Sequence, residues 1–206
     1  MPNICAISVG KVKTIRSGNE NPSQEIFSAI HKLPISTLDN PQSVHLHHLG
    51  VDGDEQANLK VHGGIDKAVY AYPAEHYLFW NECLVKEKRM SSHQELTFGS
   101  FGENLTTAGL LETEVFIGDI WQIGLTALQV TQFREPCFKF NIKMNYSGAA
   151  KKMAQTGYSG WYLKVLEQGM IMAGDQIQVT PGKRLLSIAS QSQAFYQRSG
   201  QAQLDF

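Results

Sequence analysis

The chain has 206 residues, of which 42% are hydrophobic and 18% charged, with a formal net charge of -1 and a sequence pI near 6.6. This size and composition predict a folded protein with one hydrophobic core, not a disordered chain. A net charge so close to zero argues against a nucleic-acid polymer as partner, because proteins that bind nucleic acids carry a broad positive field. Any bound anion must be held by a few local side chains.

The N-terminus lacks the basic and apolar stretches of a signal peptide, and no apolar run approaches the roughly 20 residues that cross a bilayer. We therefore expect no membrane partner and a cytoplasmic location. The three cysteines, Cys5, Cys83 and Cys137, are an odd number without metal-finger spacing. This pattern favours reduced thiols over disulfides or structural zinc.

In chain order, the first 84 residues are typical of short strands with one helix. Alternating or continuous apolar runs predict a strand at 4–9 that continues to 15, and two further strands, one around 26–37 and one at 44–49; another apolar run lies at 68–72. Loops rich in Gly, Asp, Asn, Ser, Pro or His are expected at 16–24 and 51–64. Pro73 fits the first position of a helix that runs through Leu84.

The remaining sequence continues the same pattern. Runs at 115–117, 120–123 and 127–130, separated by Gly118-Asp119 and Gly124, predict hairpin strands. A short helix is expected at 147–155, followed by strands at 161–166 and 176–180. Many short strands with few helices favour a barrel or a sandwich. Pro181-Gly182 breaks the pattern, so we predict one domain over 1–182 and a helical appendage over 183–206.

Cys137 is the main chemical candidate. It follows a predicted strand and Pro136, with Arg134 and Lys139 on either side. Neighbouring cations stabilise a thiolate, which is the form of cysteine that binds metals or attacks electrophiles. The same residues also fit a buried cysteine that packs as a small hydrophobic group among phenylalanines.

Two glycine-bearing loops are further candidates. His62 precedes Gly63 and Gly64, and paired glycines let a backbone approach an anionic ligand closely. Residues 99–105 carry Glu103 and Asn104, which could hydrogen-bond the edge of a heterocycle. Each loop also fits a purely structural turn in which the polar side chains satisfy the local backbone.

Two other polar clusters have less chemical promise. Residues 49–56 contain three carboxylates, including Asp54, without the alternating ligands of an EF-hand calcium loop, so we interpret them as a structural turn with one functional acid. His45 and His47 share one face of a predicted strand, with His48 opposite, as a zinc site would require. No further ligand with suitable spacing is present in the sequence.

Taken together, the loops resemble the MOSC domain, which is named for the C-terminal domain of molybdenum-cofactor sulfurases, and in particular its stand-alone bacterial YiiM-like branch. The resemblance rests on the order and spacing of several stretches: GVDGDEQA at 50–57, VHGG at 61–64, YPAEHY at 72–77, FGENL at 101–105, GD at 118–119 and PC at 136–137. It implies a mainly β, barrel-like fold related to the β-barrel domain of pyruvate kinase, with a few peripheral helices. Residues 183–206 would be a truncated counterpart of the branch's three-helix domain.

The resemblance also implies a molybdenum cofactor, molybdopterin, with Cys137 as the protein ligand of the metal. The residues implied to bind the cofactor are Gly10, Lys11, His62, Gly63, Gly64, Phe101, Gly102, Glu103, Asn104, Arg134 and Lys139. Of these, Arg134 and Lys139 would complement its negative charge, and Gly10 and Lys11 would hold the pterin phosphate. Besides Cys137, the implied catalytic residues are His62, Glu103 and Asp54, any of which could supply protons.

The implied activity is reduction of N-hydroxylated compounds, such as hydroxylaminopurines, hydroxylamines and amidoximes, to amines. Because the sequence has no flavin, haem or iron–sulfur motif, the electrons would come from a separate reductase. Two alternatives stay open: a carrier that holds persulfide or cofactor on Cys137, and a hydrolase that uses Cys137 with His62. The natural substrate and the choice between monomer and homodimer are not predicted.

Overall fold

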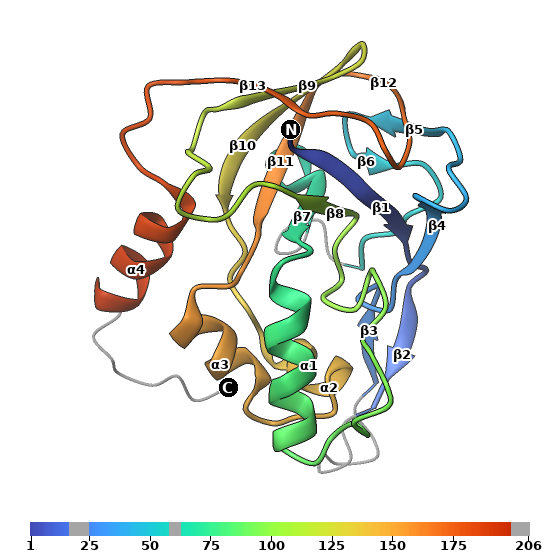
Figure 1. Cartoon of the computed structure of the whole chain (residues 1–206), viewed down its shortest axis with the longest axis vertical. Helices are drawn as coiled ribbons and strands as arrows, with labels where there is room; N and C mark the ends of the chain where they lie inside the picture. The colour runs from blue at the N-terminus through green and yellow to red at the C-terminus, as the bar shows by residue number, and fades with distance from the viewer. Residues whose placement is uncertain (17–24, 58–62, 199–206) are drawn as a thin grey trace.

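The computed structural model describes residues 1–16, 25–57 and 63–198, and its dominant element is one curled sheet of eight strands. The strand order is β13-β9-β10-β11-β7-β8-β1-β4, and every neighbouring pair is antiparallel except β7 with β8. Figure 1 shows this sheet wrapping around the upper part of the molecule. The strands are β1 (Asn3–Val9), β4 (Leu33–Thr37), β7 (Val69–Pro73), β8 (Leu105–Ala108), β9 (Ile120–Ile123), β10 (Thr126–Phe133), β11 (Trp161–Glu167) and β13 (Gln178–Thr180).

Backbone contacts bring the β13 end of this sheet back to the start of β1. The segment just before β13 lies beside the start of β1, where Asn3 and Gln176 form an antiparallel bridge. The amide of Ile4 donates to the carbonyl of Asp175 at 3.0 Å, and the amide of Ile177 donates to that of Pro2 at 2.9 Å. Pairing an edge in this way removes unsatisfied backbone groups. The predicted mainly β, barrel-like fold is therefore confirmed.

Two small sheets and several helices surround the barrel. Two further sheets are formed by β12 (Gly169–Ile171), β5 (Val44–His47) and β6 (Gly50–Val51), and by β2 (Lys13–Ile15) and β3 (Ile26–Ser28). The helices are the 3-10 turn η1 (Ile65–Lys67), α1 (His76–Lys86), α2 (Phe138–Lys143), α3 (Ala149–Thr156) and α4 (Ile188–Arg198). In Figure 1, α1, α2 and α3 gather at one end of the barrel, and α4 lies to one side. No helix among the described residues is long and apolar enough to span a membrane.

Two hydrophobic cores hold these layers. The first fills the barrel and includes the fully buried Trp121 and Trp161, whose rings meet edge to face. The second joins the sheet to α1–α3 and is mostly aromatic, with Trp80, Phe101 and Phe140 as fully buried members. Fully burying a large apolar side chain contributes roughly 1.5–3 kcal/mol. The aromatic core therefore supports the loop around Phe101 and the helix that follows Cys137.

The structure corrects three details of the sequence analysis. Pro73 is the last residue of β7, in register with Thr107 of β8, and α1 begins only at His76. Residues 115–117 form no strand; Phe116 makes one isolated bridge to Ser187. The short helix α2 was not predicted, because six residues cannot show a clear helical periodicity.

The C-terminal helix is packed against the barrel. Ile188 belongs to the barrel core, and the rings of Phe195 and Tyr196 contact Phe133 at the end of β10. The amide of Phe133 also donates to the side-chain oxygen of Gln191 at 2.7 Å. The predicted helix within 183–206 is therefore present from residue 188 to 198. The boundary between 182 and 183 stays a prediction.

Replacing Gly160 with alanine is expected to destabilise the protein more than replacing Gly157. Both residues have a left-handed φ, +63° and +71°, where a side chain costs about 1–2 kcal/mol. A Cβ at Gly157 meets nothing within 4 Å, whereas one at Gly160 would overlap the carbonyl oxygen of Ala71. Overpacking of this kind adds about 1–3 kcal/mol. Urea unfolding measures the two losses, and equal losses would contradict the close approach of β7 to residue 160.

Candidate functional site

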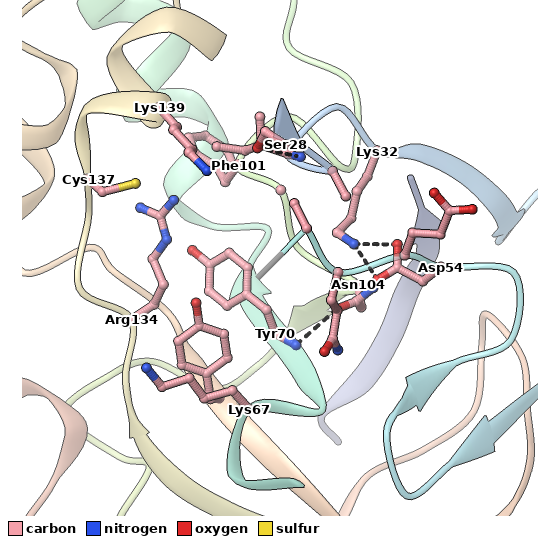
Figure 2. Close-up of a pocket in the computed structure, with 17 residues that line it drawn as sticks. Ser28, Lys32, Asp54, Lys67, Tyr70, Phe101, Asn104, Arg134, Cys137 and Lys139 are labelled. Atoms are coloured by element: carbon pink, nitrogen blue, oxygen red, sulfur yellow. Dashed lines mark hydrogen bonds and ion pairs between the residues drawn. The ribbon is translucent and has the colours of Figure 1, made fainter. Parts of the chain in front are cut away.

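A cavity of about 90 Å³ lies where segments far apart in the sequence meet beside Cys137. Its walls come from the loop before β4, the loop after β6, β7, the loop before β8, and the segment between β10 and α2 (Figure 2). Four cationic side chains reach it, against two carboxylates. These charged residues are Lys32, Lys67, Arg134, Lys139, Asp54 and Glu55. The lining therefore favours an anionic ligand.

Cys137 lies on one wall of this cavity. Its backbone is extended, with φ -133° and ψ 171°, and it directly precedes α2. The residue is partly exposed, whereas Phe140 in the following turn is fully buried. Figure 2 shows the Cys137 sulfur and the Arg134 guanidinium directed toward one another. The thiol therefore faces the cavity and is not enclosed among the phenylalanines.

Arg134 is a buried cation, only 6% exposed. Its guanidinium lies over the rings of Phe140 and Tyr70, at 5.0 and 5.5 Å from their centroids, and Nη1 donates to the sulfur of Met153 at 3.2 Å. Among the described residues no carboxylate forms an ion pair with it. A buried charge costs several kcal/mol unless an opposite charge compensates it. An anion bound in this cavity would therefore be stabilised most strongly by Arg134.

The opposite wall holds a buried ion pair between Lys32 and Asp54, whose side chains are 7% and 5% exposed (Figure 2). Lys32 Nζ donates to both carboxylate oxygens. Burial lowers the pKa of Lys32, and the charge of Asp54 opposes that shift. A lysine with a lowered pKa releases a proton more readily than a solvated one. This wall therefore offers a proton donor.

Asn104 fixes the position of Asp54. Its side-chain amide donates to Asp54 Oδ2 at 2.8 Å, and its Oδ1 accepts from the amide of Tyr70 at 3.2 Å. Its own backbone amide donates to the Tyr70 carbonyl at 2.8 Å, and its carbonyl accepts from the amide of Ser8 at 2.7 Å. Asp54 is thereby tied to β1 and β7.

Glu103 does not line the cavity. It is fully buried, and its carboxylate accepts hydrogen bonds from the Tyr77 hydroxyl, the amides of Gly99 and Phe101 at 2.8 and 3.0 Å, and Thr106 Oγ1 at 2.9 Å. Burial raises its pKa. From this position behind the cavity wall, Glu103 organises the loop that brings Phe101 and Gly102 to the wall.

The predicted phosphate-binding residues lie behind the lining. The amide of Gly10 donates to Asp54 Oδ1 at 2.7 Å, and Lys11 Nζ lies 3.2 Å from Glu55 Oε1. A Cβ at Gly10 would lie 2.7 Å from two backbone carbonyl oxygens, of residues 29 and 31, so only glycine fits there. These two residues therefore support the loop that carries Asp54 and Glu55.

Gly63 and Gly64 also lie behind the residues that line the cavity. The amide of Gly64 donates to Gln56 Oε1 at 3.2 Å, and Gly63 packs closely against the same side chain. Gln56 lines the cavity, whereas Gly63 and Gly64 do not. His62, the remaining predicted member of this loop, lies outside the described residues.

Several lining residues had no sequence pattern that marked them. Tyr70 and Tyr162 face each other across β7 and β11, with ring centroids 5.5 Å apart, and Lys67 Nζ lies 5.6 Å from the centroid of Tyr162. Lys32 lies between two apolar stretches, and its sequence context is that of an ordinary strand residue. A cross-strand pair depends on sheet order and register, which a single sequence does not give.

Comparison with known proteins places the chain in a family. Residues 58–178 match the model of the MOSC domain. The uncharacterized protein YflK of Bacillus subtilis (strain 168) is 37% identical over 187 residues, which cover 90% of this chain and 77% of YflK. A protein of Gibberella moniliformis (strain M3125 / FGSC 7600) named "Reductase" is 34% identical over 174 residues, covering 84% of this chain and 28% of that protein.

A solved structure agrees with these matches. The crystal structure of YiiM from Geobacillus stearothermophilus superposes with a TM-score of 0.74 and 32% sequence identity, covering 97% of this chain and 86% of that one. The family match covers more than half of the chain, and the fold similarity extends over almost all of it. The chain therefore belongs to the MOSC domain family, in its YiiM-like branch, as its sequence motifs indicated.

Proposed function

We propose that this protein is an oxidoreductase that binds a molybdenum cofactor through Cys137 and reduces N-hydroxylated compounds to amines. The observation that carries the proposal is that a thiol and the buried Arg134 face the same cavity, and that no carboxylate among the described residues pairs with Arg134. Membership of the MOSC family supports the cofactor. The relative named "Reductase" supports a reductive reaction, although the chain spans only 28% of that protein.

The donor set suits a molybdenum-bearing pterin. A thiolate is a good ligand for a soft or high-valent metal, and a pterin phosphate and dithiolene are anionic. Cys137 would supply the sulfur, and Arg134, Lys67 and Lys139 would compensate the negative charge. When bound, the cofactor would supply a two-electron reducing centre. The aromatic rings of Tyr70 and Tyr162 would then form an apolar wall beside it.

Reduction of a hydroxylamine to an amine and water consumes two electrons and two protons. The described residues include no cluster of cysteines for an iron–sulfur centre, so the electrons would come from a separate reductase. We assign the proton supply to Lys32, with Asp54 as its partner, because both line the cavity and Lys32 has a lowered pKa. General acid catalysis by a positioned group typically contributes about 10²–10⁴-fold in rate.

Replacing Cys137 with serine should abolish turnover of N-hydroxyadenine and remove bound molybdenum, because a neutral hydroxyl is a poor metal ligand. The protein is purified from cells that make the pterin, its metal content is measured, and turnover is assayed with an artificial electron donor. Cys83→Ser is the matched control, because Cys83 is a partly exposed thiol on α1 that does not line the cavity. It should retain metal and turnover.

Two results would contradict the reductase. Equal metal content and turnover in wild type and Cys137→Ser would exclude Cys137 as the ligand. A wild-type protein that carries cyanide-labile sulfur on Cys137 but turns over no N-hydroxylated compound would favour a sulfur carrier instead.

Replacing Arg134 with methionine should weaken cofactor binding by about 2–5 kcal/mol, the usual cost of losing one partner of a buried charge pair. Without cofactor, the same variant should unfold at an equal or higher temperature than wild type, since an uncompensated buried charge has been removed. Thermal unfolding with and without cofactor measures both effects. Lys139→Met removes a partly exposed charge and should cost less. A destabilised empty Arg134→Met protein would contradict the uncompensated-charge interpretation.

The alkaline limb of turnover against pH should report the Lys32 ammonium. Turnover should fall as pH rises through the Lys32 pKa, which burial lowers below its ordinary value. Because Asp54 opposes that shift, Asp54→Asn should move the limb to lower pH. Asp66→Asn, which changes an exposed carboxylate near Lys164, should leave the limb in place. An unchanged limb in Asp54→Asn would exclude Lys32 as the proton donor.

A further inference from the structure

The outer face of the small β5–β6–β12 sheet presents two histidines that the proposed reaction does not use. Along β5, Val44 and Leu46 are buried, whereas His45 is partly exposed and His47 is exposed. Both imidazoles therefore lie on the solvent side. Their ring centroids are 4.2 Å apart, and Nδ1 of His45 lies 3.2 Å from both ring nitrogens of His47.

The two imidazoles are close enough for a nitrogen of each to share one metal ion. A single hydrogen bond would place one nitrogen of His47 much closer to His45 than the other, but the two distances are equal and the rings meet at 70°. Two nitrogens bound to one ion at about 2.0–2.1 Å with tetrahedral angles lie about 3.3 Å apart. The observed 3.2 Å separation is close to this value, and His47 is exposed, so its ring can turn one nitrogen toward such an ion.

The neighbouring strand supplies a sulfur. Met170 of β12 is directly opposite His45 in the antiparallel register, and opposite residues share a face with their Cβ atoms about 4.5–5.5 Å apart. Burial confirms the orientation, because Met170 is 52% exposed and the next residue, Ile171, is 1% exposed. Met172, the next outward residue, is 38% exposed. Two imidazoles and at least one thioether therefore share this face.

We propose that His45, His47 and Met170 bind a cuprous ion. No three or more His, Cys, Asp or Glu side chains gather as a metal group within the described ranges, so the ligand set of a structural zinc site is missing there. Thioether sulfur favours Cu(I), and imidazole accepts copper readily. In Figure 1 this small sheet lies at the upper right, away from α2, which follows Cys137. The site is thus separate from the proposed cofactor site.

The test is competition for Cu(I) between the full chain and a chromophoric Cu(I) chelator, without oxygen and with reductant present. All variants keep the three cysteines, so binding by thiols is common to them. Wild type should bind one equivalent more than the His45→Gln/His47→Gln chain. Met170→Leu should weaken that equivalent by at least about ten-fold, since even outer partners of a metal ligand contribute that much. Labelled methionine methyl groups should show a Cu(I)-dependent NMR shift that disappears in Met170→Leu.

His93→Gln is the matched control, because His93 is an exposed histidine in the segment after α1; its Cu(I) binding should equal that of wild type. Circular dichroism confirms that each variant is folded. Equal Cu(I) uptake by wild type and the double histidine variant would overturn the proposal. So would an unchanged affinity in Met170→Leu, or Zn²⁺ binding that is tighter than Cu(I) and insensitive to residue 170.

Discussion

The carboxylate of Asp54 is the point on which the cavity depends. It accepts hydrogen bonds from the Gly10 amide, the Lys32 ammonium and the Asn104 side chain. These donors come from the end of β1, the segment before β4 and the loop before β8, so one buried group joins three distant parts of the chain. A buried carboxylate is tolerated only when its oxygens are satisfied in this way. These hydrogen bonds hold the wall together and fix the position of Lys32 on it.

The opposite wall has a different character. Arg134 follows β10 and lies among aromatic rings, and its backbone amide donates to the carbonyl of Gly160 at 3.2 Å. It has no carboxylate partner in the part of the chain that the structure describes. Within the described residues, one buried cation, Lys32, is therefore paired with a carboxylate and the other, Arg134, is not. This asymmetry is the basis of our proposal that an anion binds next to the Cys137 thiol.

Topology explains why these walls meet. The β7–α1–β8 unit is a crossover between parallel strands, so the starts of β7 and β8 lie at the same edge of the sheet. The loop before β8 carries Asn104 and Phe101, and β7 carries Tyr70. Glu103 stabilises that loop from behind through four hydrogen bonds. The sequence motif suggested Glu103 as a catalytic acid, but its position suits it to holding the loop that forms the wall.

Local sequence was sufficient for much of the fold and for part of the site. Apolar periodicity located most strands and α3, because burial of one face imposes a period on the chain. The thiol of Cys137 with its neighbour Arg134 was also visible, since the two are close in sequence. Pro73 was misassigned, because a proline is accepted both at the start of a helix and at the end of a strand. Which applies depends on the pairing with β8.

Only the tertiary structure decided which polar residues share a cavity. Lys32 has no distinguishing neighbours in the sequence, and its role follows from its burial against Asp54. Met170 is opposite His45 only because of the β5–β12 register. The electrostatic energy between two charged side chains depends on their distance and burial. Strand order and register set both, and no short stretch of sequence encodes them. The amino-acid sequence by itself determined the family, the β-rich fold and the candidate thiol, and the packed sheet determined the charges that surround that thiol.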